Sequence, residues 1–564
     1  MGKTRRRFAL RIGVAGFLVG TSALVTGHVA QARGAAPGSA SATVGVARRP
    51  APPVLSAATF PVTNCASLTG ADLTRNREAP ATVTAATVVP KAGKDPQYCD
   101  VHGYVTPQVQ FEVGLPTNSW NGDYYQTGGG GRDGTIPFGS CVDALAQGFA
   151  VAAQDGGHVG SDALWGLTDE QLRVDWAYRS DHVTAVVAKE LISIFYGRAP
   201  RYSIMQGCST GGREVESEVQ RYPSDFDGAI AGDPAYPGRL AGIENAWLAQ
   251  KGLDANGRPI LGADKLRLLH GAVVDACDGL DGLRDGTIDD PRDCPFDPAT
   301  LRCPRGARDV GDCLTPAELA SAQAFYHGPV DEHGQALYPY LAPYGSELSW
   351  AATATSAAQL ADSGLKDLNL PIGAPTPASY RDWRFTDANI ARLVPMAKVY
   401  DPVPPYGHPD LGAFARHGGK LLIYQGWADA AANPGAAVDY YTEAANALGG
   451  PQRTMGWLRL FMVPGMGHCG GGDGPSTFDP LTPMLAWLRD GTAPDRLVAS
   501  NSATSPLNPG RSRPLYPYPQ VARYDGTGSV ESAANFHAAP PPVAHAGDLH
   551  WIWDPAPPGR NPHR

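Results

Sequence analysis

The feature that most constrains this fold is the segment RYSIMQGCSTGG at residues 201–212, which contains the pattern Gly-x-Ser-x-Gly. This pattern is typical of a nucleophile elbow, a sharp turn between a strand and a helix that exposes a serine hydroxyl. The glycines are needed because a Cβ atom would clash within so tight a bend. The apolar residues before Ser209 predict a strand, and residues 213–221 predict a helix. Because the chain has 67 glycines, a chance match within a loop is the alternative.

The apolar pattern around this segment indicates alternating strands and helices. Residues 98–126 predict strands that lead into a run of four glycines, residues 149–158 predict a buried strand, and residues 174–197 predict an amphipathic helix. The alternation is lost from residue 235 to about 400 and resumes with strands at 419–426 and 458–463. This order predicts a mainly parallel sheet covered by helices on both faces. We therefore expect an α/β core formed by residues 60–234 and 401–537, with residues 235–400 inserted as a lid domain.

Three residues with catalytic chemistry each follow the end of a predicted strand: Ser209, Asp429 and His468. Open α/β sheets place their sites at the carboxyl ends of strands, and the order Ser, Asp, His is that of the α/β-hydrolases. A serine hydroxyl needs an imidazole to take its proton, and the imidazole needs a carboxylate to orient it. An isolated Asp or His in a loop is usually a turn former or a surface residue. Three in this order predict a catalytic triad.

The N-terminal residues have the composition of an export signal. Residues 4–8 read TRRRF, an apolar stretch covers 12–25, and AQA stands at 30–32 as a cleavage site. This predicts a twin-arginine signal at residues 1–32 and a secreted or extracytoplasmic protein. A membrane anchor is disfavoured because a spanning helix needs about 20 apolar residues. We expect residues 33–59 to be a flexible leader and residues 538–564 to be a disordered, proline-rich tail.

The charge balance limits the classes of partner. Without the five basic residues of the signal, 41 basic residues face 55 acidic ones, and the net formal charge moves from −9 to −14. So acidic a chain disfavours nucleic acids and anionic membranes as partners. The oligomeric state is not predicted.

Nine cysteines in an exported chain predict disulfides with one cysteine left over. Spacing alone does not determine the pairing. Cys277–Cys294 and Cys303–Cys313 are close enough to close short loops, and a Cys65–Cys99 bond would tie the N-terminal region together. Cys208 and Cys469 neighbour Ser209 and His468. If serine and histidine are within hydrogen-bond reach, the two cysteines would come within the Cα separation of about 5.5 Å that a disulfide requires.

Two glycine-rich segments have two interpretations each. The run at 128–131 could bring a backbone amide to a ligand as a second oxyanion donor, or it could be a flexible turn. The segment CDGLDGLRDGTI at 277–288 places acidic side chains in a tight loop that suits a hard cation such as Ca²⁺. Its spacing is not that of an EF-hand, and a solvated acidic loop is the alternative.

These residues resemble the tannase/feruloyl esterase family, which includes the monohydroxyethyl terephthalate hydrolases. The family's motif of Cys-Ser, Asp and His-Cys is matched by Cys208-Ser209, Asp429 and His468-Cys469. The resemblance runs from about residue 65 to residue 536 and includes the segments WNGDYYQTGGGG, FMVPGMGHCGGG and RSRPLYPYPQVARYDG. It implies an α/β-hydrolase core with a lid inserted between the elbow and the acid.

The resemblance also implies ligands and donors. A structural Ca²⁺ in the lid would be bound by three carboxylates and two backbone carbonyls, those of Asp278, Asp281, Asp285, Leu283 and Thr287. The oxyanion donors would be Thr210 and the glycine run, through Gly129 or Gly130. Many relatives carry a cysteine pair where this chain has Tyr516 and His537. That leaves Cys141 as the expected unpaired thiol.

The sequence therefore predicts an exported serine carboxylester hydrolase that cleaves small esters of aromatic acids through an acyl-enzyme on Ser209. A feruloyl esterase is the first interpretation, and a tannase or a monohydroxyethyl terephthalate hydrolase is the second. A non-catalytic exported binding protein on the same fold is the alternative from another class. The intact set of Ser, Asp and His argues against it, because a decayed site would be expected to lose one member.

Overall fold

The computed structural model describes residues 60–235, 239–307, 311–337, 342–401, 409–501 and 508–545. The predicted export signal, the predicted leader and residues 546–564 of the predicted tail lie outside the described residues. Within the described ranges, no helix is both long and apolar enough to cross a membrane.

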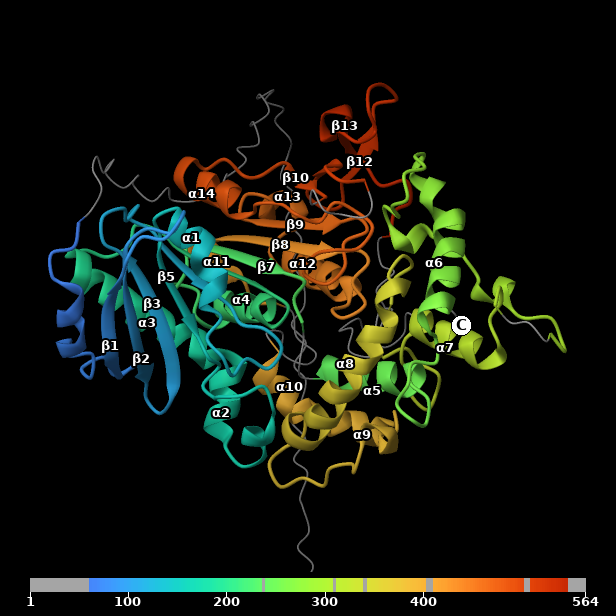
Figure 1. The fold of residues 1–564 in the computed structure, drawn as a ribbon, viewed down its shortest axis with the longest axis horizontal. Helices are drawn as coiled ribbons and strands as arrows, with labels where there is room; N and C mark the ends of the chain where they lie inside the picture. Colours follow the sequence, from blue (N-terminus) through green and yellow to red (C-terminus); the bar gives the residue numbers. More distant parts are fainter. Residues whose placement is uncertain are drawn as a thin grey trace, which may run out of the picture. The chain divides into compact units, whose positions relative to one another are not determined.

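A nine-stranded mixed sheet forms the centre of the structure (Figure 1). Its strands lie in the order β1 (Ala81–Val89), β2 (Tyr98–Val105), β3 (Val109–Pro116), β5 (Ala150–Gln154), β4 (Tyr124–Thr127), β6 (Ser203–Cys208), β7 (Gly228–Gly232), β8 (Lys420–Gly426) and β9 (Leu458–Val463). The pairs β1–β2, β2–β3 and β3–β5 are antiparallel. All pairs from β5 to β9 are parallel, so the ends of β6, β8 and β9 meet at one edge.

Apolar side chains on successive residues of the central strands pack into different clusters. In β6, Met205 joins a cluster with α3 (Ser180–Tyr196), α4 (Thr210–Arg221), α11 (Gly412–His417) and α12 (Pro434–Ala447). Its neighbour Ile204 joins a second cluster with α1 (Val142–Ala146) and α14 (Leu481–Asp490). Because successive strand residues point to opposite faces, continuous apolar runs let helices cover both sides.

Helix α3 continues two shorter helical turns. These are α2 (Glu170–Val174) and a π-helical turn at Asp175–Arg179. Together they correspond to the helix predicted at 174–197, which leads into the elbow strand.

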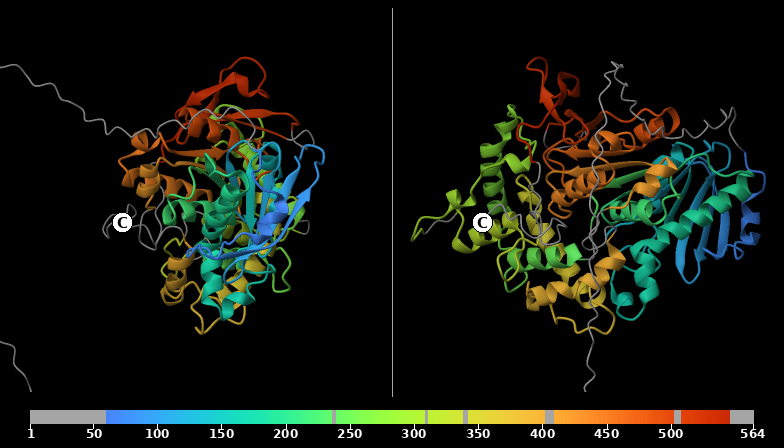
Figure 2. Two further views of the ribbon diagram at one scale, coloured as in Figure 1. Left: turned by 90° about the vertical axis from the view of Figure 1, so that its left-hand side faces the viewer. Right: turned by 180° about the vertical axis from the view of Figure 1, so that it is seen from behind.

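Residues 233–419 separate β7 from β8, and no described residue among them adds a strand to the sheet. We call residues 235–400 the inserted segment. Its helices are α5 (Arg239–Gly252), α6 (Ala263–Cys277), α7 (Pro316–His327), α8 (Trp350–Ser363), α9 (Asp387–Ala391) and α10 (Val394–Tyr400). Figures 1 and 2 show these green to gold helices gathered into one group. They bury a hydrophobic cluster largely their own, with Trp350 and Trp383 at most 2% exposed.

Two small antiparallel sheets follow β9. They pair β10 (Leu497–Ser500) with β11 (Ser512–Leu515), and β12 (Val521–Tyr524) with β13 (Phe536–Ala539). The prediction of a disordered tail from residue 538 is wrong at its start, because Ala538 and Ala539 pair with β12.

Candidate active site

The elbow holds Ser209 in a strained backbone conformation between β6 and α4, with φ 64° and ψ −121°. A Cβ atom on Gly207 would lie 2.5 Å from the backbone of Gly211. A Cβ atom on Gly211 would lie 2.8 Å from the carbonyl oxygen of Gly129. Both glycines are therefore required by close backbone approach, and the serine hydroxyl faces away from the turn toward His468.

The structure brings the three residues of the predicted triad together. His468 Nε2 lies 2.8 Å from Ser209 Oγ, and His468 Nδ1 lies 2.7 Å from Asp429 Oδ2. Asp429 is fully buried, and its Oδ1 accepts hydrogen bonds from the backbone amides of Ala431 and Ala432 at 2.7 and 2.9 Å. These two amides fix the carboxylate in the orientation that faces the imidazole.

The electrostatics of the site favour the protonated form of His468. Burial opposes that form, but the hydrogen bond and the charge of Asp429, with the charge of Asp233, outweigh it and raise the pKa of His468 to about 9. The imidazolium that forms when neutral His468 takes the proton of Ser209 is thus stabilised.

The structure contains four disulfides, and they join the four predicted pairs: Cys65–Cys99, Cys208–Cys469, Cys277–Cys294 and Cys303–Cys313. The Cys208–Cys469 bond spans 6.0 Å between Cα atoms and joins the residue before Ser209 to the residue after His468. Cys141 is free and buried, and burial raises the pKa of its thiol. It lies in the hydrophobic cluster that contains Ile204, and its Sγ donates to the carbonyl oxygen of Ala152 at 3.5 Å.

A further carboxyl group, that of Asp233, lies beside the triad. It follows the carboxyl end of β7, is fully buried and has a positive φ of 37°. Its Oδ1 accepts from the amide of Gly426 at 2.7 Å, and its Oδ2 accepts from the amide of Cys469 at 3.0 Å. Burial, followed by the charge of Asp429, raises the pKa of Asp233 to about 8. The sequence analysis did not select Asp233, because it predicted no strand at residues 228–232, whereas Asp429 follows a predicted strand.

The amides of the glycine run are not placed as the resemblance implied, which was that Gly129 or Gly130 donates to the oxyanion. The amide of Gly129 donates to Glu214 Oε2 at 2.7 Å, and the amide of Gly130 donates to Asp133 Oδ1 at 2.8 Å. Both groups point at internal carboxyls and away from Ser209, so the structure does not support either as an oxyanion donor. The next residue, Gly131, lines the cavity beside Ser209 and Thr210.

A cavity of roughly 370 Å³ opens at Ser209 and His468 between the core and the inserted segment. The core contributes Gly131, Arg132, Trp176 and Thr210, and the inserted segment contributes Glu244, Asn245, Leu248, Leu360, Leu368 and Asn369, among others. Arg132 donates to the carbonyl oxygen of Leu360 at 2.8 Å, and burial lowers its pKa to about 10. The cavity thus combines apolar walls with a few charged and amide groups, as is common in sites for small organic ligands.

The acidic loop wraps around Asp278. Its Oδ1 accepts from the amides of Asp285, Gly286 and Thr287 at 3.0 to 3.2 Å. A neighbouring cavity is lined by the other four predicted ligands, Asp281, Leu283, Asp285 and Thr287, and by Asp289. Asp278 is not among the lining residues.

The donor set of this loop fits a hard divalent cation. Burial raises the pKa of Asp281 to about 6 and that of Asp289 to about 8, and the charges of their acidic neighbours add to the effect. Carboxylates that repel one another, together with backbone carbonyls, suit Ca²⁺. Arg513 also pairs with Asp285, so part of the negative charge is already balanced by the protein.

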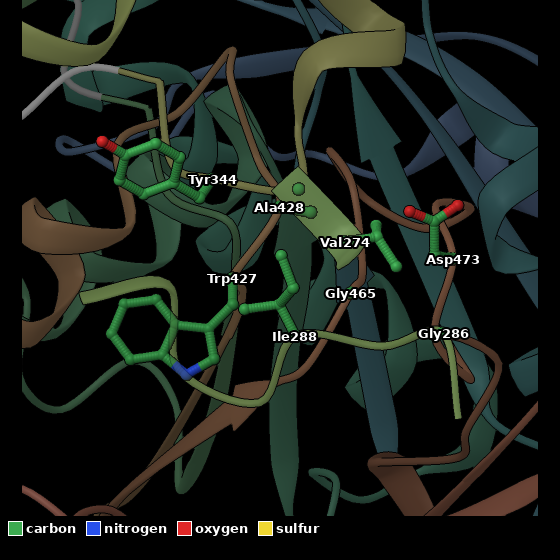
Figure 3. A pocket seen from close by; sticks show the side chains of 9 residues that line it. Val274, Gly286, Ile288, Tyr344, Trp427, Ala428, Gly465 and Asp473 are labelled. Atoms are coloured by element: carbon green, nitrogen blue, oxygen red, sulfur yellow. The ribbon is translucent and has the colours of Figure 1, made fainter. Parts of the chain in front are cut away.

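The inserted segment contacts the core at Trp427 and Ala428, the two residues that precede Asp429. Figure 3 shows Trp427 and Ala428 of the core lining a small pocket with Val274, Ile288 and Tyr344 of the inserted segment and with Asp473.

His270 of α6 crosses the same boundary. Its Nε2 lies 3.0 Å from Asp473 Oδ2, and its Nδ1 lies 2.8 Å from Glu347 Oε2. Since Asp473 follows His468 by five residues, this contact ties the inserted segment to the loop that carries the triad histidine.

A model of the family described as tannase and feruloyl esterase matches residues 92–539. The chain belongs to this family. Members of the tannase and feruloyl esterase family are carboxylic ester hydrolases, and the chain is an enzyme of that class.

Relatives in the tannase and feruloyl esterase family match most of the chain. Mono(2-hydroxyethyl) terephthalate hydrolase of Piscinibacter sakaiensis is 34% identical over 538 residues, which cover 82% of this chain and 87% of that protein. A probable feruloyl esterase B-1 of Aspergillus oryzae is 31% identical and covers 75% of this chain and 79% of that protein. The crystal structure of feruloyl esterase B from Aspergillus oryzae superposes with a TM-score of 0.73 at 26% identity, covering 81% of this chain and 97% of that one. The fold is therefore the α/β-hydrolase fold that the order of strands and triad residues predicts.

Proposed function

We propose that this chain is an exported serine esterase that hydrolyses esters of aromatic acids through an acyl-enzyme formed on Ser209. The observation that carries the proposal is the continuous hydrogen-bonded relay from Asp429 through His468 to Ser209, on the wall of a cavity. A non-catalytic binding protein would not need this relay. The four disulfides support an oxidising compartment, in line with export.

In the acylation step, Ser209 Oγ attacks the ester carbonyl carbon while His468 Nε2 takes the hydroxyl proton. Asp429 stabilises the resulting imidazolium through Nδ1. The bond from the carbonyl carbon to the alcohol oxygen then breaks, and the alcohol leaves with the proton from His468. In the second step, a water molecule loses a proton to His468 and attacks the acyl carbon. Ser209 Oγ departs and recovers that proton, and the free acid is released.

The oxyanion formed in each step would be stabilised by backbone amides. We assign this role to the amides of Thr210 and Gly131. Thr210 is the first residue of α4, whose N-terminus favours negative charge, and both residues line the cavity beside Ser209.

The size and the walls of the cavity support an aromatic acyl group. Trp176, Leu248 and Leu368 offer apolar surface for a ring. The names of the relatives point the same way, since feruloyl and terephthalate groups are aromatic acyl groups. A tannase-like or terephthalate monoester preference is the second candidate. Glu244 could accept hydrogen bonds from ring hydroxyls, and Arg132 could pair with a second carboxylate.

We also propose a structural Ca²⁺ in the acidic loop, held by Asp281, Asp285 and the carbonyl oxygens of Leu283 and Thr287. The second carboxylate oxygen of Asp278 would complete this set, because its Oδ1 holds the loop amides. When bound, the ion would supply positive charge to the loop and take no part in acyl transfer.

The proposal is tested by a hydrolysis panel of methyl ferulate, methyl gallate and mono(2-hydroxyethyl) terephthalate, with release of free acid measured by chromatography. The wild type should cleave at least one ester. Ser209→Ala and His468→Ala should each lower kcat by about 10⁴-fold or more with the fold intact. Asp429→Asn should also lose most activity, because it favours the wrong imidazole tautomer. Full activity in Ser209→Ala, or no cleavage of any ester by the wild type, would contradict the proposal.

A further inference from the structure

Two buried carboxyl groups lie behind the glycine run beside Ser209. Glu214 is 1% exposed and comes from α4, the helix that begins at the elbow, and Asp133 is 7% exposed and comes from the loop after β4. Glu214 Oε2 accepts from the amide of Gly129, and Asp133 Oδ1 accepts from the amide of Gly130. Two successive amides of this loop are thus held by two acids, Asp133 of the same loop and Glu214 of α4.

The glycine run is held on its carbonyl side as well. The carbonyl oxygen of Gly129 accepts from the amide of Gly211 at 3.0 Å, and that of Gly131 accepts from Thr210 Oγ1 at 2.7 Å. A Cβ atom on Gly129 would lie 1.7 Å from Asp133 Oδ1, so the loop and the acids are in full contact. The loop is therefore clamped between the elbow and the two carboxyl groups.

The clamp has its own charge balance. Arg213 is fully buried, and its Nη2 donates to Glu214 Oε1 at 3.3 Å. Burial raises the pKa of both acids, and the charge of Asp133 further raises that of Glu214. The charge of Asp181 adds to this effect on Glu214, and the charge of Arg213 lowers the pKa of both acids in return. Burial thus favours the protonated forms of the two carboxyl groups, and Arg213 offsets the negative charge that remains.

The backbone at Asp133 is strained, with φ 56°. Asn and Asp tolerate this region best among residues with a side chain, and strain of this kind persists where the surrounding structure holds it. This backbone conformation directs the Asp133 carboxylate toward the glycine run, where it accepts from the amide of Gly130.

We propose that Asp133 and Glu214 are positioning residues for ester hydrolysis: they hold Gly129 and Gly130 so that the amide of Gly131 meets the oxyanion formed at Ser209. The inference rests on the proposed serine esterase function. Its physical basis is that an oxyanion hole acts through donors fixed in place before the reaction. A misplacement of about 1 Å is enough to cost roughly 100-fold in rate.

Variants of Asp133 separate the hydrogen bond from the strain. Asp133→Asn keeps an oxygen for the Gly130 amide and tolerates the positive φ, and its amide nitrogen can take the position of Oδ2, which has no hydrogen-bond partner. Asp133→Gly removes the acceptor but also removes the strain. With an activated ester, we expect Asp133→Asn to stay within about threefold of the wild-type kcat and Asp133→Gly to lose roughly 10- to 100-fold, with KM changed less than about threefold.

A second readout reports the oxyanion hole itself. An aryl boronic acid forms a tetrahedral adduct on a catalytic serine, so its affinity should fall in parallel with kcat in Asp133→Gly, while the affinity for the product acid should not. Glu214→Ala, from the other element, should show the same pattern. The matched control is Asp181→Asn, a buried acid whose charge acts on Glu214 but whose carboxyl group is bonded to Gln126 and Gln154 and not to the loop amides. It therefore removes a neighbouring charge without removing a hydrogen bond to the glycine run. It should change the melting temperature without changing kcat.

The outcomes are distinguishable. If the wild type cleaves no ester and binds no boronic acid at Ser209, the proposed function fails. If the wild type is active and both Asp133→Gly and Glu214→Ala keep its kcat and boronic acid affinity, only the positioning role is wrong. The role is also wrong if Asp133→Asn loses as much kcat as Asp133→Gly. If Asp133→Gly does not fold, kcat and boronic acid affinity are compared between Glu214→Ala and Asp181→Asn. Equal values in these two variants would then contradict the positioning role.

Discussion

Asp233 Oδ2 accepts a hydrogen bond from the backbone amide of Cys469 at 3.0 Å, across 236 positions of the sequence. The same carboxyl accepts from the amide of Gly426, the last residue of β8. Asp233 therefore joins the ends of β7 and β8 to the turn that carries His468. One of its carboxylate oxygens also lies within 4.8 Å of the sulfur atoms of Cys208 and Cys469, so the carboxyl group and the disulfide hold the same turn.

We predict that Asp233→Asn shifts the pH profile of kcat/KM. In the wild type, kcat/KM should rise with pH toward about 9, because His468 acts as a base only when it is neutral. The charge of Asp233 contributes to the raised pKa of His468, so its removal should move the rising limb to lower pH. An Asn offers one acceptor to two amides, which should also cost about 1 to 3 kcal/mol of stability. An unchanged profile would show that Asp233 exerts no charge effect on His468.

The Cys208–Cys469 disulfide should be needed for activity before it is needed for folding. It closes a loop of 261 residues, for which chain entropy predicts stabilisation of about 5.5 kcal/mol. Since it also joins the neighbours of Ser209 and His468, Cys208→Ser/Cys469→Ser should lower kcat at temperatures where circular dichroism still reports a folded protein. The matched control is Cys303→Ser/Cys313→Ser, whose disulfide spans 10 positions in the inserted segment. It should keep the wild-type kcat. Equal kcat in the two double variants would contradict a bracing role.

The strands and the triad could be predicted because their signals are local. The apolar run at 458–463 matches β9 residue for residue, and the residues that follow each strand are fixed by the chain itself. Parallel strands then bring Ser209, Asp429 and His468 to one edge without further information. The pairing of Cys208 with Cys469 follows from the same placement.

The residues that the sequence analysis missed act as acceptors for backbone amides. Asp133 and Asp233 are single acids in loops, and nothing local distinguishes them from turn formers. Their role depends on which amide lies opposite, which is decided by backbone directions that a sequence pattern does not encode. The choice of glycine failed for the same reason. The run allows close approach at each position, but only the folded loop determines that Gly129 and Gly130 face inward.

Removal of calcium should lower the melting temperature. A ligand that binds only the folded state at about 100 times its Kd contributes about 2.7 kcal/mol. Chelation should therefore destabilise the protein and raise KM for large aromatic esters more than it changes kcat for a small activated ester, because the loop lies in the inserted segment. The measurement is a thermal melt with and without EDTA, with elemental analysis of the purified protein.

Asp281→Ala is the control for this experiment, since it should melt like the chelated wild type and no longer respond to EDTA. Arg513 offers the competing explanation, because it already pairs with Asp285. An unchanged melting temperature and no bound calcium would mean that arginines alone balance the acidic loop.

The contact of His270 with Asp473 and Glu347 should make stability depend on alkaline pH. Burial opposes the imidazolium, but hydrogen bonds to Asp473 and Glu347 outweigh it and raise the pKa of His270 to about 10. Tyr326 also donates to Glu347 at 2.8 Å, and burial raises the pKa of its hydroxyl well above the ordinary value of a tyrosine. Because the folded pKa exceeds the unfolded value of about 6.5, the stabilisation is complete below about pH 6.5 and is lost as pH rises through about 10.

His270→Gln should remove this pH dependence. It leaves two carboxylates facing a neutral amide, which should cost about 3 kcal/mol at pH 7. The melting temperature of the wild type should therefore fall more steeply than that of His270→Gln between pH 7 and 10, and the two should converge at the alkaline end. Asp473 lies in the loop of His468, so the same loss should loosen the inserted segment over the cavity and raise KM at high pH in the wild type. Parallel melting curves would show that His270 does not hold its proton in the folded state and that its contact with Asp473 does not help to fasten the inserted segment to the core.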